Sequence, residues 1–101
     1  MLQIMTEQTD GQITMHLQGR MDLSGAKTAN QSFMEQAELT KRIILDCTEL
    51  EYVASAGLRV LRQLHQTMKD QGGTLVLKAV RPDVMDIFEM TGFDALLAIE
   101  P

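Results

Sequence analysis

Three consecutive apolar residues, Ile43, Ile44 and Leu45, follow a basic pair and end at Asp46. A short apolar run without polar interruption is typical of a strand that is buried on both faces. Such a strand lies inside a sheet rather than at its edge, and helices cover it. We therefore expect a central strand here, and with it a layered fold of helices and strands.

The residues before this strand show two other periodicities. Residues 12–18 alternate apolar and polar side chains, as in a half-buried strand, and residues 2–5 are expected to pair with them across the Asp10-Gly11 turn. Apolar residues at helical spacing then predict an amphipathic helix over about residues 23–38. Its inner face is expected to carry Leu23, Ala26, Asn30, Phe33 and Ala37.

Beyond Asp46 the sequence predicts a polar connection over residues 47–52 and then a second helix, which closes at Gly72-Gly73. Residues 74–80 are expected to form an apolar strand. Pro82 begins a third helix that ends at Gly92, and residues 96–99 form a last short strand. The inner face of the second helix is expected to carry Leu58, Leu61, Leu64, His65 and Met68.

The elements therefore follow the order β-β-α-β-α-β-α-β. Right-handed crossovers between parallel strands place helices against a sheet, and the opening hairpin makes that sheet mixed. We expect an α/β fold in which a small mixed β-sheet has helices packed against it. With 101 residues, no linker and no internal repeat, the chain is expected to form a single domain over residues 1–101.

Composition and charge exclude several classes of function. The formal net charge is −5 and no Lys/Arg cluster is present, so we expect no nucleic-acid partner. Cys47 is the only cysteine, which excludes an internal disulfide and a thiolate metal site and points to the cytoplasm. No uncharged stretch approaches the ~18 residues of a spanning helix and no export signal begins the chain, so no direct membrane insertion is expected.

No set of side chains points to catalysis. His16 on a strand and His65 on the inner side of a helix are each interpreted as structural residues. Asp46, Glu49 and Glu51 would suit an acid–base or magnesium cluster, but a solvated connecting loop explains them as well. Because phosphate-binding loops and metal-ligand spacings are missing, we expect no enzyme, no metal site and no cofactor.

A run of small residues stands apart at the start of the second helix. Ser55 lies within Val53-Ala54-Ser55-Ala56-Gly57-Leu58, where small side chains let another backbone approach closely. One interpretation makes Ser55 the N-cap, whose oxygen accepts a hydrogen bond from an amide of the first turn. Another makes it a phosphorylation site, because a phosphate at a helix N-terminus meets free amides and the positive end of the dipole. The two roles can coexist.

Several motifs together resemble the STAS domain, in particular the bacterial anti-sigma factor antagonists. They are Ile43-Ile44-Leu45-Asp46, the later Ser55-Ala56-Gly57-Leu58-Arg59-Val60-Leu61 and Thr91-Gly92-Phe93. Gly19-Arg20-Met21-Asp22 likewise resembles the Gly-x-x-Asp turn that follows the early strands of that family. The resemblance covers essentially the whole chain, and the order and spacing of the motifs make it specific.

The resemblance implies a partner switch. In that family the unphosphorylated antagonist binds an anti-sigma factor that is also a serine kinase of the GHKL ATPase type, and this frees a sigma factor. The kinase phosphorylates the antagonist, and a PP2C-type phosphatase restores it. The resemblance thus implies two protein partners, an anti-sigma factor with a GHKL-type kinase domain and a PP2C-type phosphatase.

The sequence departs from the family pattern at the phosphorylated residue. The family acceptor is the serine directly before the glycine in Asp-Ser-Ser-Gly, and the corresponding residues here are Ala54, Ser55, Ala56 and Gly57. Either Ser55 is the acceptor, moved by one residue, or the domain binds its partner without covalent control. We favour Ser55, because it is the only hydroxyl in this loop and lies near a helix N-terminus.

The resemblance also implies where the partner binds. Asp22 would lie near the Ser55 loop in the family arrangement, or else serve as a helix N-terminal residue with Ser24 as an alternative cap. The partner is expected to contact that loop, the Asp22 turn and the outward face of the second helix, with the residues Asp22, Ala54, Ser55, Ala56, Gly57, Arg59 and Arg62. A second function stays open, because isolated STAS domains also resemble cytoplasmic accessory subunits of lipid-transport ABC complexes.

Overall fold

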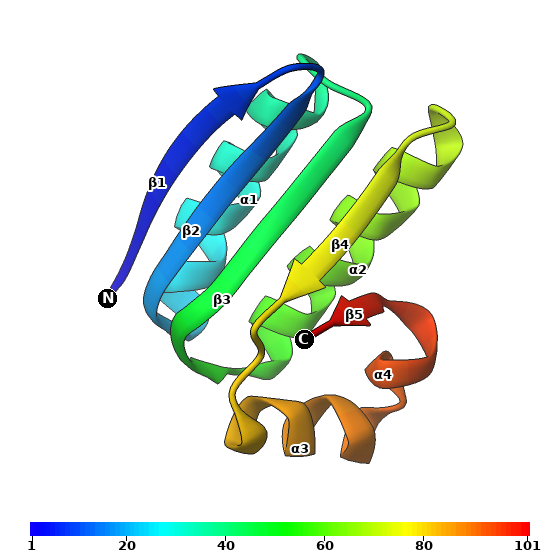
Figure 1. Cartoon of the computed structure of the whole chain (residues 1–101). Coiled ribbons are helices and arrows are strands. Elements are labelled where there is room, and N and C mark those ends of the chain that lie inside the picture. The colour runs from blue at the N-terminus through cyan, green and yellow to red at the C-terminus, as the bar shows by residue number, and fades with distance from the viewer.

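Five strands form one mixed sheet, in the spatial order β1-β2-β3-β4-β5 (Figure 1). Strands β1 and β2 pair antiparallel, and all other neighbours pair parallel. The computed structural model describes all 101 residues. Its elements are β1 (Leu2–Thr9), β2 (Gln12–Met21), α1 (Leu23–Ala37), β3 (Arg42–Val53), α2 (Ser55–Asp70), β4 (Thr74–Lys78), α3 (Pro82–Thr91), α4 (Phe93–Leu96) and β5 (Ala98–Glu100). The predicted α/β class and the predicted order are confirmed, with the single-turn helix α4 added before the last strand.

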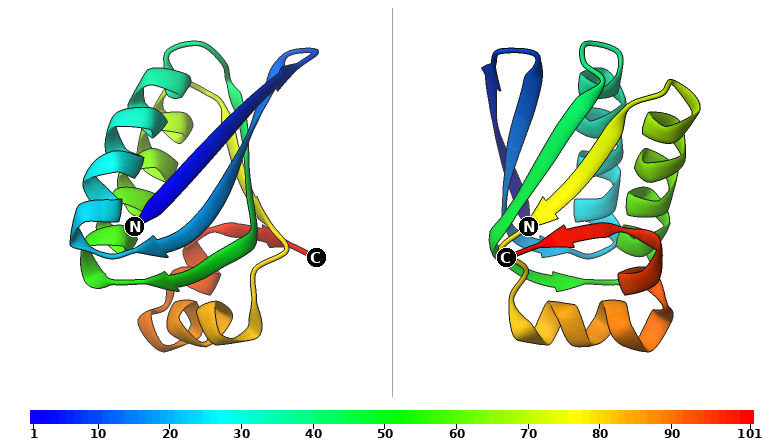
Figure 2. Two further views of the ribbon diagram at one scale, coloured as in Figure 1. Left: turned by 90° about the vertical axis from the view of Figure 1, so that its left-hand side faces the viewer. Right: turned by 45° about the vertical axis from the view of Figure 1, so that its right-hand side comes forward.

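Helices α1 and α2 lie side by side on one face of the sheet, and the opposite face is open (Figure 2). Strand β3 is central, as predicted, but it is buried on one face only. Ile43 and Leu45 are fully buried under the helices, whereas Ile44 between them is half-buried on the open face. A short run of apolar residues is therefore compatible with two arrangements. The strand can be buried on both faces, or it can carry a single isoleucine on a face that is open to solvent.

Strand β3 is also longer than predicted. The expected polar connection over residues 47–52 is wrong, because the strand continues to Val53 and buries Cys47 and Leu50 on the way. The register between β2 and β3 shifts twice, between His16 and Gln18 and again between Gly19 and Arg20. Such bulges add residues to one strand and break the alternation of inward and outward side chains. This second half of β3 therefore has no period of two that sequence analysis can detect.

The inner face of α1 differs from the predicted one at two positions. Leu23 is 68% exposed and Asn30 is half-buried, while the buried residues are Gly25, Ala26, Ala29, Phe33 and Ala37. Small residues let this helix pack closely, since a Cβ atom on Gly25 would lie 2.4 Å from the carbonyl oxygen of Arg20. The inner face of α2 is as predicted for its four leucine and methionine positions, and its His65 is half-buried.

The C-terminal third follows the prediction with small changes. Helix α3 starts at Pro82, contacts β3, and ends before Gly92, which adopts the left-handed conformation with φ of +79°. The last strand is shifted by about two residues, because residues 93–96 form α4 and the strand begins at Ala98. No helix has the length and hydropathy needed to cross a membrane.

Candidate functional site

Two loops meet at the edge of the sheet where β2 and β3 end. Parallel strands have their carboxyl ends at the same edge, so the β2–α1 and β3–α2 connections are neighbours there. Met21 and Val53 are paired at the ends of the two strands, and the Ala54 N–H donates to the Met21 carbonyl oxygen over 3.0 Å. The structure thus places the Asp22 turn and the Ser55 loop together, as the family resemblance implies.

Gly57 allows the close approach of these two loops. It is buried, and a Cβ atom at this position would lie 2.8 Å from the Met21 carbonyl oxygen and 2.9 Å from a methyl group of Val53. The sequence predicted that small residues here admit another backbone. That backbone is the chain's own, at Met21, so Gly57 shapes the site from inside the domain.

Asp22 is the N-cap of α1. Its side chain accepts a hydrogen bond from the Gly25 N–H over 2.9 Å, and the Ser24 hydroxyl donates to the same oxygen over 3.1 Å. The Gly25 amide, followed by the Ser24 hydroxyl, lowers the pKa of the Asp22 carboxyl below its usual value. Asp22 therefore holds a negative charge in a fixed position, and Ser24 supports the cap rather than replacing it.

Ser55 is the first residue of α2 rather than its N-cap. Ala54 is in the cap position with extended backbone, and no side chain caps this helix end. The interpretation of Ser55 as the cap is therefore wrong, because Ala54 is the cap residue and no side chain accepts a hydrogen bond from the first-turn amides. Ser55 is exposed, and the first helical hydrogen bond runs from the Leu58 N–H to the Ala54 carbonyl over 2.9 Å.

One exposed face of α2 carries the other candidate residues. Ser55, Arg59 and Arg62 are all exposed and are separated by four and three residues, so they share one side of the helix. Ala54 and Ala56 are half-buried, and Ala56 packs against the hydrophobic core. We use the name junction surface for Asp22 together with Ser55, Arg59 and Arg62.

Sequence reasoning missed Leu23 as a surface residue. It directly follows Asp22, begins α1, and leaves 68% of its area exposed. Its position in the helical pattern assigned it to the core. No local signal marks Leu23 as exposed, because its spacing to Ala26 and Asn30 fits the buried stripe of a helix.

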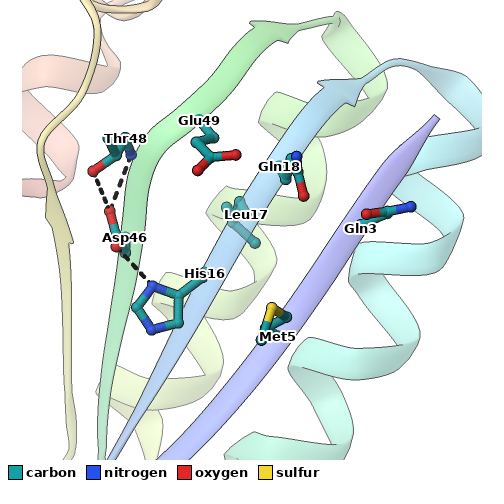
Figure 3. Close-up of a pocket in the computed structure, with 8 residues that line it drawn as sticks. All are labelled: Gln3, Met5, His16, Leu17, Gln18, Asp46, Thr48 and Glu49. Carbon is teal, nitrogen blue, oxygen red and sulfur yellow. Dashed lines mark hydrogen bonds and ion pairs between the residues drawn. The ribbon is translucent and has the colours of Figure 1, made fainter.

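The acidic residues expected on a solvated connecting loop lie instead on strand β3. Asp46 and Glu49 line a small pocket of about 90 Å³ on the open face of the sheet, and Glu51 lies exposed outside it. The pocket also contains His16, whose Nδ1 lies 2.7 Å from Asp46 Oδ2 (Figure 3). Cys47, next along the strand, is fully buried, and this burial raises the pKa of its thiol to about 12.

Comparison with known proteins gives one consistent family. A sequence model of the STAS domain matches residues 3–101. A protein from Bordetella bronchiseptica that carries the name anti-sigma factor antagonist BtrV is 28% identical over 99 residues, which cover 97% of this chain and 85% of the relative. The crystal structure of an anti-sigma factor antagonist from Mycobacterium paratuberculosis has a TM-score of 0.88 at 20% identity, and the match covers 100% of this chain and 86% of that one.

A further similar structure is the Bacillus cell fate determinant SpoIIAA in its phosphorylated form. Its TM-score is 0.75 at 15% identity, and the match covers 98% of this chain and 92% of that chain. The sheet and helices described above are thus shared with solved proteins over nearly their whole length.

Proposed function

The chain belongs to the STAS domain family, and on this premise we propose that it is an anti-sigma factor antagonist that works by partner switching. In its unmodified state it binds an anti-sigma factor with a GHKL-type serine kinase domain, and the sigma factor is released. The kinase phosphorylates Ser55 and ends the complex, and a PP2C-type phosphatase removes the phosphate. In this proposal the chain is a regulatory binding protein and a substrate of both enzymes.

The observation that carries the proposal is the position of Ser55. It is the only hydroxyl in residues 53–58, it is exposed, and it begins α2 beside the loop that holds Asp22. The kinase reaches the hydroxyl without unfolding the helix, because no cap hydrogen bond holds this side chain. The structural neighbour SpoIIAA has been solved in a phosphorylated form. This supports the proposal that the present chain is also a phosphoprotein.

A phosphate on Ser55 acts on the partner rather than on the fold. It adds about −1.5 to −2 charges at a helix N-terminus, where the amides and the dipole favour an anion. The same charge is added to a surface that already carries the Asp22 carboxylate. Arg59 lies four residues farther along the same face, so the phosphate can pair with the Arg59 guanidinium. The positive charge of Arg59 is then no longer available to the partner.

Three substitutions at Ser55 test the proposal. We expect Ser55→Asp to keep the circular dichroism and the melting temperature of the parent protein but to lose the kinase partner in a pull-down. Ser55→Asn is the matched control, because asparagine has the size of aspartate without its charge, and it should bind. Ser55→Ala should bind and stay unmodified in intact-mass measurements with the recovered kinase and ATP.

Three outcomes would contradict the proposed function or the assignment of Ser55. A phosphate that mass spectrometry maps to Thr48, or to any residue outside residues 53–58, would exclude Ser55 as the acceptor. Recovery of an ABC transporter ATPase instead of a kinase would support the second function that the family resemblance leaves open. Loss of binding in Ser55→Asn as well as in Ser55→Asp would show that bulk, rather than charge, separates the partners.

A further inference from the structure

A histidine on the open face of the sheet has a carboxylate at each ring nitrogen. His16 Nδ1 lies 2.7 Å from Asp46 Oδ2, and His16 Nε2 lies 3.2 Å from Glu7 Oε1. The three residues come from three adjacent strands, Glu7 from β1, His16 from β2 and Asp46 from β3. Figure 3 shows the His16–Asp46 contact among the residues that line the pocket on that face.

The chemistry of these groups requires a proton on each ring nitrogen. A neutral imidazole has one N–H donor and one lone pair, whereas an ionised carboxylate can only accept. Asp46 is held in its ionised form, because its other oxygen accepts from the Thr48 N–H over 3.0 Å and from the Thr48 hydroxyl over 2.6 Å. Two carboxylates therefore contact one imidazole favourably only when that imidazole is the doubly protonated cation.

We propose that His16 is a proton-controlled cross-link that fastens strands β1 and β3 to β2 across the open face of the sheet. Loss of one proton leaves a single N–H on the ring. The shorter contact, to Asp46, keeps it, and the contact to Glu7 is lost. Strand β1 is an edge strand, so this step loosens the side-chain attachment of the hairpin while the backbone ladder to β2 remains.

The other charged groups near this cluster do not replace the cross-link. Glu49 lines the same pocket but makes no hydrogen bond to the ring. On β4, Lys78 is the register partner of Asp46, but its ammonium group lies 3.9 Å from Glu100. The Arg81 guanidinium donates to the Thr48 carbonyl over 2.8 Å. His16 is therefore the cation that the Glu7 and Asp46 carboxylates share.

The cluster sets the direction in which the stability of the fold depends on pH. The hydrogen bond to Asp46 raises the pKa of His16 above its ordinary value of 6.5, with further attraction from Asp46 and Glu7, and partial burial opposes the shift. Because the pKa of His16 is raised in the folded state, protonated His16 stabilises the fold fully below pH 6.5. This stabilisation is lost as the pH rises through the folded-state pKa. The Thr48 hydrogen bonds lower the pKa of Asp46 below 3.8, so its contribution is lost only in acid.

A histidine titration by NMR tests the proposal with the full chain. The His16 signal, distinguished from that of His65 by the variant His65→Gln, should titrate with a midpoint above 6.5. Asp46→Asn and Glu7→Gln should each lower that midpoint, with the larger decrease in Asp46→Asn. Glu49→Gln is the matched control from the same pocket and should leave it unchanged.

The nitrogen chemical shifts of the His16 ring provide a second readout. Non-specific attraction by surrounding carboxylates would raise the pKa but would not fix the remaining proton on one ring nitrogen. Above the midpoint, the remaining proton should be on Nδ1, facing Asp46. A wild-type midpoint at or below 6.5, or equal decreases in Glu7→Gln and Glu49→Gln, would overturn the cross-link. A remaining proton on Nε2 would also overturn it, because Glu7 would then be the retained partner.

Discussion

One glycine, Gly57, determines how closely the two loops of the junction surface approach each other. A side chain at this position would meet both the backbone and the side chain of Met21 at less than 3.0 Å. Asp22 directly follows Met21 and accepts from the Gly25 N–H, and Ser55 lies two residues before the glycine. The close approach of the two loops therefore requires a residue without a Cβ atom at position 57.

The substitution Gly57→Ala tests this contact. In an open helix alanine would be favoured over glycine by about 1 kcal/mol. Here the added methyl group must displace Met21, and overpacking of this kind costs about 1–3 kcal/mol. We expect a net loss in the free energy of unfolding, measured by urea denaturation. A stabilised variant would show that the loops are farther apart than described.

Residue identity alone does not reveal the pairing of His16 with Asp46. The two are 30 positions apart in the sequence, and only the parallel register of β2 and β3 places them opposite each other. The sequence by itself predicts a structural role for His16 on a strand and places Asp46 on a solvated loop. The capping role of Asp22, by contrast, is a local property, and the sequence could indicate it.

At the scale of elements, local periodicity explains which parts of the fold could be predicted. Helix α2 has a strong pattern over its whole length, and its outer face and its inner leucine and methionine positions are as expected. The second half of β3 has two register shifts, so its inward residues follow no regular spacing and the sequence wrongly predicts a loop there. The resemblance to a known family, rather than periodicity, placed Asp22 near Ser55.

The two faces of α2 should respond differently to truncation. Leu61 is fully buried, so we expect Leu61→Ala to lower the free energy of unfolding by about 2–5 kcal/mol through lost burial and a cavity. Arg62, the next residue, is exposed, and Arg62→Ala should change stability by less than about 0.5 kcal/mol. Similar losses in both variants would mean that the helix is rotated relative to the described packing.

At the scale of the whole molecule, the proposed interface combines one acidic and two basic side chains at one end of the sheet. Arg59→Glu and Arg62→Glu each change the charge by two units on the junction surface. We expect each to weaken the complex with the anti-sigma factor by roughly tenfold or more, about 1.4 kcal/mol, without a change in melting temperature.

The control for this prediction lies on the same helix. Lys69→Glu makes the same change in charge in the last turn of α2, far along the helix from Ser55, and should bind like the parent protein. Titration calorimetry with the purified anti-sigma factor measures all three variants. If Arg59→Glu and Arg62→Glu also bind like the parent, the partner docks on another face of the domain.

Release of a sigma factor tests the central claim most directly. The anti-sigma factor recovered by pull-down is first saturated with its sigma factor, and this protein is then titrated in while free sigma factor is measured. We predict that the unmodified protein and Ser55→Ala release the sigma factor in a dose-dependent way, and that protein phosphorylated on Ser55 does not. Equal release by the phosphorylated and unmodified forms, or no release by either form, would contradict the partner switch proposed here.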